Sequence, residues 1–161
     1  MELNLELKPG TQPIIYRFRD LNPELEEKLQ NQIQTWLDEG VSEPSKSPWS
    51  SPSVPVRKKD GGIRWPVDYR LVNKHLVMDS YRLPRIQQLV EKAGSLWVYS
   101  ALDAVTAYYT IPVAQEARPL TAFTSPHGLY QWVQMPFGLC VFQICSSYFE
   151  SNGDQQAASL S

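Results

Sequence analysis

The chain has 161 residues, a formal net charge of −2 and 13 prolines, which favours one domain of mixed helix and strand over a helical bundle. With only two cysteines, the chain is not expected to carry a disulfide framework. It has no apolar run near the roughly 20 residues of a membrane span and no signal-peptide pattern, so we expect no membrane contact and an intracellular, cytoplasmic protein. Residues 57–92 carry nine lysines and arginines against four acids. Such a basic middle fits phosphate contact, although a solvated charged face is its commoner meaning.

The first half of the chain contains the clearest predicted element. Residues 1–21 are expected to be extended, with residues 11–20 as a possible edge segment. Residues 22–40 predict a helix, because Asn22 can cap it, Pro23 suits its first turn and Gly40 ends it. Its apolar positions recur at helical spacing: Leu25, Leu29, Ile33, Trp36 and Leu37. We expect this stripe to face the core.

A basic hairpin is predicted next. The serine- and proline-rich residues 42–55 indicate either an ordered turn sequence or a linker, and residues 54–73 predict two strands joined by the turn Asp60-Gly61-Gly62. Lys58, Lys59 and Arg64 flank this turn and can project together toward a triphosphate. A charged hairpin kept soluble by its bases is an equally weighted alternative.

The second half alternates short elements. A helix is predicted near residues 84–92, ending at Gly94, and a strand runs through the apolar residues around Asp103. Two further strands are predicted at residues 120–125 and 129–134. The polar residues 144–161 are expected to fray.

Asp103 is the one carboxylate within the best predicted strand. An acid at a strand end suits Mg²⁺, which prefers oxygen ligands, but an Asp that caps a strand-to-turn junction is the commoner case. Tyr108 and Tyr109 follow it and Phe137 lies further on. These aromatic side chains can stack on a sugar or base, or can belong to the core.

Four blocks in a fixed order carry a family resemblance: residues 37–52, 56–86, 100–113 and 121–139. Together they resemble the reverse transcriptase of gypsy-type LTR retrotransposons and retroviruses. The resemblance covers roughly residues 10–143 and implies an α+β fold: the fingers and the first part of the palm of a right-handed polymerase. On this basis we divide the chain into an extended segment (1–21), fingers and partial palm (22–143) and a tail outside the family (144–161).

The resemblance also implies roles for single residues. Lys58 and Arg64 match the fingers residues that grip the incoming triphosphate. Tyr108 matches the position that screens against a ribose 2′-hydroxyl, and Phe137 lies where the family lines the nucleotide pocket. The implied partners are an RNA or DNA template-primer and deoxynucleotides.

The implied catalytic centre is incomplete. Asp103 matches the first metal-binding aspartate of the palm, and the main-chain oxygen of Ala104 would complete the shell of its Mg²⁺. The implied reaction adds deoxynucleotides to a primer 3′-hydroxyl under template direction. The family's Tyr-x-Asp-Asp hairpin is absent, however, because the acids after Asp103 are only Glu116, Glu150 and Asp154. Thumb and RNase H portions have no counterpart either, and the asparagine-, alanine- and proline-rich segment that follows Met-Pro-Phe-Gly-Leu in the family is missing.

These departures define two expectations. The first is a reverse transcriptase fragment of a retroelement Pol polyprotein that is inactive alone; the alternative is a non-catalytic nucleic-acid-binding or interaction module derived from such an element. Loss of the hairpin is also expected to expose one edge of the palm sheet and, if they face that edge, to leave apolar side chains such as Leu102 and Trp132 without partners. We therefore expect self-association, or association with a completing polymerase chain.

Overall fold

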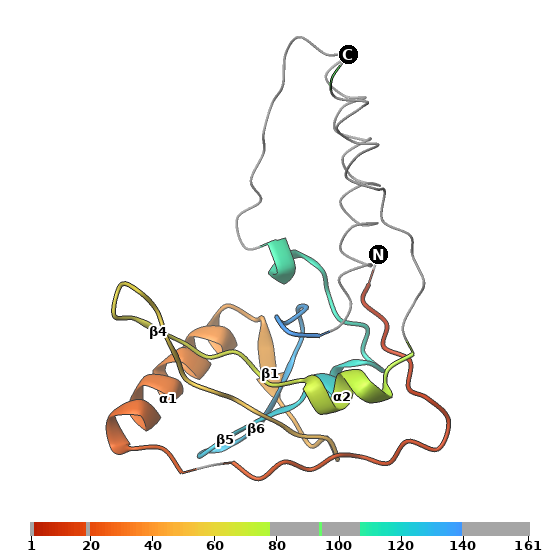
Figure 1. Ribbon diagram of the computed structural model, residues 1–161, viewed down its shortest axis with the longest axis horizontal. Helices are drawn as coiled ribbons and strands as arrows, with labels where there is room; N and C mark the ends of the chain where they lie inside the picture. Colours follow the sequence, from red (N-terminus) through yellow and green to blue (C-terminus); the bar gives the residue numbers. More distant parts are fainter. Residues whose placement is uncertain (1, 19, 78–93, 95–106, 140–161) are drawn as a thin grey trace. The chain divides into compact units, whose positions relative to one another are not determined.

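The computed structural model describes residues 2–18, 20–77, 94 and 107–139. The chain divides into two compact units, one of Met1–Val77 with Tyr108–Cys140 and one of Met78–Ala107 with Val141–Ser161. The first unit holds nearly all the described residues (Figure 1). The predicted helix at 84–92, the strand through Asp103 and the C-terminal tail lie outside the described residues.

Helix α1 (Pro23–Asp38) forms where the sequence predicts it. The side-chain oxygen of Asn22 accepts a hydrogen bond from the N–H of Leu25 at 2.8 Å, which satisfies one of the donors that a helix N-terminus leaves open. Leu29, Ile33 and Trp36 are buried. The apolar stripe therefore faces the core, as predicted.

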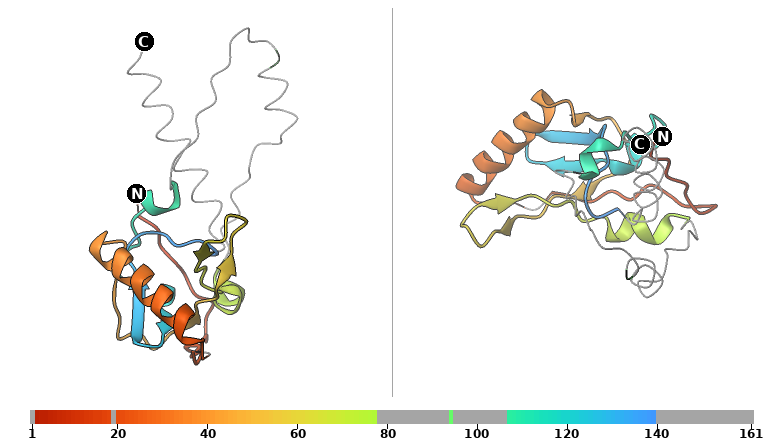
Figure 2. Two further views of the ribbon diagram at one scale, coloured as in Figure 1. Left: turned by 90° about the vertical axis from the view of Figure 1, so that its left-hand side faces the viewer. Right: turned by 90° about the horizontal axis from the view of Figure 1, so that it is seen from above.

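A sheet of four short strands packs against α1. It comprises β1 (Ser42–Pro44), β2 (Ser51–Pro52), β5 (Phe123–Ser125) and β6 (Gly128–Trp132), in the order β1-β6-β5-β2. Only the β2–β5 pair is parallel. The segment at 42–55 is thus ordered and supplies two strands. Figure 2 shows α1 lying across the β5 and β6 strands.

Trp132 is buried by this packing. Its ring lies 4.8 Å from that of Trp36 and 5.2 Å from that of Phe123, measured between centroids, and the residue is 2% exposed. The expectation that Trp132 would lack partners is therefore wrong, because α1 covers it. The aromatic cluster joins the two halves of the sequence in one core.

Two predicted strands are shorter than expected. The second hairpin strand was expected to reach residue 73, but β4 (Ile63–Arg64) ends early and α2 (Arg70–His75) follows. Pro66 cannot donate to a ladder, and the Asp68 carboxylate accepts from the Arg70 N–H at 3.1 Å, which favours a helical turn. Likewise β5 begins only at Phe123, because Pro119 lies in a preceding 3₁₀ helix, η2 (Arg118–Thr121).

The N-terminal segment is extended, as predicted, and is bound by isolated bridges. Leu3 pairs with Val113, and Ile15 pairs with Ser50. Leu3 is 0% exposed, so this segment contributes to the core as well as to backbone pairing. Among the described residues we find no helix with the length and apolarity required to cross a bilayer.

Candidate nucleotide-binding site

The basic hairpin forms as predicted from β3 (Val56–Arg57) and β4. The N–H of Lys58 donates to the carbonyl of Gly62 at 2.7 Å, and the Asp60 carboxylate accepts from the Gly62 N–H at 3.1 Å. Gly61 has a φ of 82°, a conformation that glycine adopts without strain. Arg57, Lys58, Lys59 and Arg64 are exposed. The tight turn therefore holds four basic side chains near the tip of the hairpin.

A cavity separates this hairpin from α1 and from the second half of the sequence. Figures 1 and 2 show the hairpin extending beside α1. From α1 the cavity takes Gln32 and Trp36, and from the hairpin it takes Lys58 and Arg64. None of its lining residues is a carboxylate. The two bases therefore face the cavity with no acid among the residues that line it, which favours an anionic ligand.

Aromatic rings form one wall of the cavity. Tyr109, in the 3₁₀ helix η1 (Ala107–Thr110), stacks on Trp132 with centroids 5.8 Å apart. Phe137 meets Tyr109 edge-on at 5.6 Å and is 47% exposed. Burial, and to a smaller extent the charge of Glu39, raise the pKa of the Tyr109 hydroxyl. The wall therefore runs from a buried base at Trp132 to an exposed rim at Phe137, where a flat ring can stack.

Buried hydrogen bonds fix the base of this wall. The Tyr69 hydroxyl donates to the carbonyl of Thr121 at 2.6 Å, and the hydroxyl of Thr121 accepts from the backbone N–H of Trp132 at 2.9 Å. Burial raises the pKa of Tyr69 well above its usual range, so the phenol stays a neutral donor. Sequence reasoning missed Tyr69 and Thr121, because each looks like an ordinary strand residue until the fold joins them.

The structure therefore brings together four of the residues that the sequence singled out: Lys58, Arg64, Tyr109 and Phe137 all line one cavity. Asp103 and Ala104 lie outside the described residues, and of Tyr108 the structure describes only the backbone, in η1. It is the neighbouring Tyr109 whose side chain lines the cavity.

Metal ligands are not gathered in the part of the chain that the structure describes. No group of three or more His, Cys, Asp or Glu residues there is arranged to hold an ion. The residues that line the cavity also include no carboxylate.

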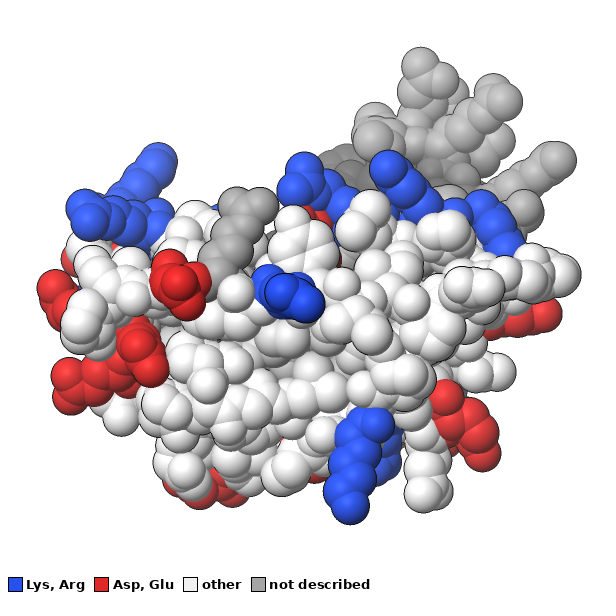
Figure 3. Space-filling model, turned by 90° about the horizontal axis from the view of Figure 1, so that it is seen from below, with Lys and Arg blue, Asp and Glu red and all other residues white. Residues whose placement is uncertain are grey.

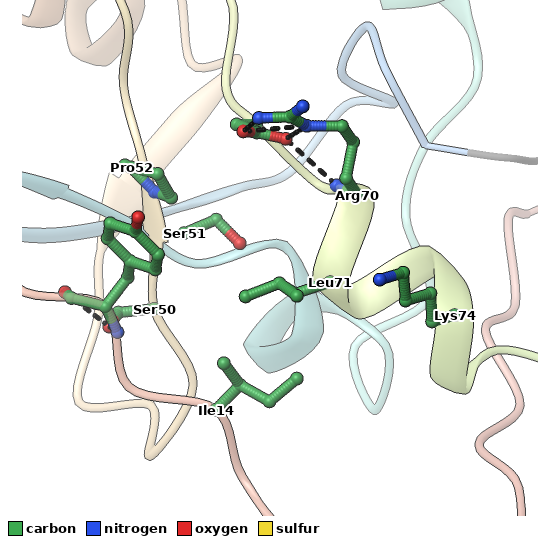
Figure 4. Close-up of a pocket in the computed structure, with 9 residues that line it drawn as sticks. Ile14, Ser50, Ser51, Pro52, Arg70, Leu71 and Lys74 are labelled. Carbon is green, nitrogen blue, oxygen red and sulfur yellow. Dashed lines mark hydrogen bonds and ion pairs between the residues drawn. The ribbon is translucent and has the colours of Figure 1, made fainter.

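A second cavity lies beside α2 (Figure 4). Arg70 forms a two-pronged ion pair with Asp68 at 2.6 Å, which lowers the pKa of that carboxyl. Lys74 lines the same cavity, as do the apolar side chains of Ile14 and Leu71. On the face shown in Figure 3, basic and acidic side chains both appear around a largely uncharged centre. Charge thus collects at particular sites rather than over that whole face.

The sequence matches the model of a known protein family. Residues 56–152 match the family model "Reverse transcriptase (RNA-dependent DNA polymerase)", so the chain belongs to the reverse transcriptase family. Members of this family generally use Mg²⁺. The match confirms the family inferred from the order of motifs; the gypsy-type assignment stays a prediction.

Similar proteins point the same way. The chain is 34% identical over 143 residues to the "Enzymatic polyprotein" of Cauliflower mosaic virus (strain Strasbourg), covering 86% of this chain and 21% of that protein. It is 31% identical over 141 residues to the "Retrovirus-related Pol polyprotein from transposon 412" of Drosophila melanogaster, covering 84% and 11%. The chain thus corresponds to the reverse transcriptase segment of retroelement polyproteins and spans about a fifth or less of their length.

A solved structure supports the fold. The chain is similar to the foamy viral protease-reverse transcriptase in complex with double-stranded DNA, with a TM-score of 0.65 and 24% identity, over 84% of this chain and 25% of that one. This agreement confirms the mixed α and β reverse transcriptase fold that the sequence predicted.

Proposed function

We propose that the described unit is the fingers portion of a reverse transcriptase and that its cavity receives the triphosphate end of an incoming deoxynucleotide. The observation that carries the proposal is the placement of Lys58 and Arg64 on the wall of a cavity whose lining has no acid. Lysine supplies a point charge and arginine a planar fork of donors, a combination suited to phosphate oxygens. Phe137 and Tyr109 supply ring surface in the same cavity.

The test compares basic residues that line the cavity with basic residues that do not. Titration of dATP into the chain by isothermal calorimetry is expected to show binding that Lys58→Ala or Arg64→Ala weakens about tenfold, which corresponds to about 1.4 kcal/mol. Arg57→Ala and Lys59→Ala are matched controls, because these bases lie on the same hairpin outside the cavity lining. Equal losses in all four variants would mean that the hairpin acts only as a diffuse charge.

Nucleic acid contact is the second part of the proposal. Lys74 lines the second cavity from α2, beside the ion pair of Arg70 with Asp68, and we infer that Lys74 contacts a nucleic acid backbone there. The foamy viral relative is described in complex with double-stranded DNA, which supports the inference. Binding of an RNA–DNA template-primer is expected to fall steeply with salt, and Lys74→Ala is expected to reduce the salt slope by about one unit. Lys46→Ala, an exposed base outside both cavities, should leave the slope unchanged.

Polymerisation by this chain alone is not expected. Asp103 is the one carboxylate that the family pattern assigns to metal binding here, and no Asp-Asp pair occurs in the sequence. One carboxylate cannot neutralise two metal ions, and loss of such stabilisation costs many powers of ten in rate. Primer extension with Mg²⁺ and deoxynucleotides should give no product; extension that Asp103→Asn abolishes would contradict this part of the proposal.

A further inference from the structure

The turn that carries Phe137 is fixed at both ends. Met135 is 0% exposed, and its N–H donates to the carbonyl of Ile111 at 2.8 Å. Leu139 is 8% exposed. Between these buried anchors Phe137 projects outward, 47% exposed, against the edge of Tyr109. The position of this ring therefore depends on what holds the middle of the turn.

Asn73 of α2 holds it. Its side-chain nitrogen Nδ2 donates to the carbonyl of Gly138 at 2.9 Å, a bond between residues 65 positions apart. Gly138 has a φ of 93°, and a Cβ at this position would lie 3.2 Å from the carbonyl oxygen of Val67. The turn thus lies directly against the chain that follows β4, and the Asn73 side-chain amide is hydrogen-bonded to the same glycine.

Helix α2 is a firm base for this bond. Val72 is 1% exposed, and the backbone N–H of Asn73 donates to the carbonyl of Tyr69 at 2.8 Å. Asparagine is disfavoured within helices relative to alanine. An asparagine in a helix of only six residues is explained by the bond that its side chain makes to the turn.

We infer that Asn73 is a positioning residue, which holds the 135–139 turn so that Phe137 forms the rim of the nucleotide cavity. The inference rests on the proposed function of that cavity. Asn73 is not among the residues that line the cavity, so it acts through the turn and not by touching a ligand. Its substitution should therefore change the orientation of Phe137 and, through it, the affinity for nucleotide.

The first measurement concerns the ring alone. With 4-fluorophenylalanine at position 137, the ¹⁹F spectrum of the wild-type chain is expected to show one resonance, shifted by the neighbouring Tyr109 ring. Asn73→Asp keeps the shape of the side chain but removes its N–H donors, and Asn73→Ala removes the amide altogether. In both variants the resonance should move toward that of an exposed ring. Asn31→Ala, an exposed helical asparagine on α1, should leave it in place.

The second measurement concerns the site. Binding of dATP, followed in the same labelled proteins, is expected to weaken about fivefold in both Asn73 variants, the equivalent of one ordinary hydrogen bond. An unchanged resonance in both variants would overturn the inference, and so would a shifted resonance with unchanged affinity, since Asn73 would then be structural only. A wild-type chain that fails to bind dATP would instead overturn the proposed function, while the ¹⁹F comparison would still show whether Asn73 holds the turn.

Discussion

Two parts of the candidate nucleotide cavity are held in different ways. On one side Trp36 and Trp132 are buried between α1 and the sheet, at 7% and 2% exposure. On the other side Lys58 and Arg64 stand on a hairpin whose strands are two residues long and whose side chains are mostly exposed. Packing therefore sets the shape of the cavity, and a local turn sets its charge. The two properties should be separable by mutation.

Trp132→Ala tests the packed side and should have the largest effect. It removes the ring that contacts Trp36, Phe123 and Tyr109, and loss of a buried tryptophan typically costs about 3–5 kcal/mol. The urea midpoint of far-UV circular dichroism should fall accordingly. Phe137→Ala is the control, because that ring is half exposed and should cost far less. Equal losses of unfolding free energy in Trp132→Ala and Phe137→Ala would mean that the buried and exposed ends of the aromatic wall contribute equally to stability.

Tyr69→Phe should come next. It deletes the hydroxyl that donates to the buried carbonyl of Thr121, and an unsatisfied buried acceptor costs about 1–3 kcal/mol. The same urea unfolding measurement applies. Tyr130→Phe, at a half-buried position, should change the unfolding free energy by less than about 0.5 kcal/mol. A neutral Tyr69→Phe would show that the Thr121 carbonyl finds another donor.

Gly61→Ala tests the hairpin side. At a φ of 82° a side chain costs about 1–2 kcal/mol, and only the turn should bear the strain. We expect faster hydrogen exchange at the Lys58 amide, which bonds across the turn, with little change at Leu29 in α1. Exchange that accelerates at both amides would show that the hairpin and the core unfold together, so that the two parts of the cavity are not held independently.

Asp68→Asn should have the smallest effect. The hydrogen bonds from Arg70 lower the pKa of Asp68 from its usual value near 3.9. Because the pKa of Asp68 is lower in the folded state than in the unfolded state, its ionised carboxylate stabilises the fold at pH values above the unfolded-state pKa. This stabilisation is lost as the pH falls through the folded-state pKa. Because the Arg70 side chain is 86% exposed, while that of Asp68 is 24% exposed, the pair is only partly shielded from solvent and should contribute at most about 1 kcal/mol.

Urea midpoints measured from about pH 6 down to about pH 3 would show this contribution. The wild-type chain should lose slightly more stability on acidification below about pH 4 than Asp68→Asn does. Identical profiles for the two proteins would mean that the ion pair adds nothing to folding.

Some of the fold and site could be predicted because the signals are local. The cap at Asn22, the apolar spacing of Leu29 and Ile33, and the Asp60-Gly61-Gly62 turn each act within a few residues, and both elements formed where expected. The predicted site residues Lys58 and Arg64 follow from that turn. By contrast, the strand predicted through residue 73 failed, because periodicity alone did not register the Pro66 and Asp68 features that give α2.

The sequence by itself determined the family, through the order of its motifs, together with helix α1 and the basic hairpin, since caps, turns and helical spacing act over short distances. Only the tertiary structure decided that α1 buries Trp132, that Tyr109 lines the cavity, and that Lys58, Arg64 and Phe137 meet around it. Long-range hydrogen bonds support this arrangement: they join Tyr69 to Thr121, 52 positions apart, and Asn73 to Gly138, 65 positions apart. No local pattern encodes such pairs, because each partner is satisfied only once the core has packed.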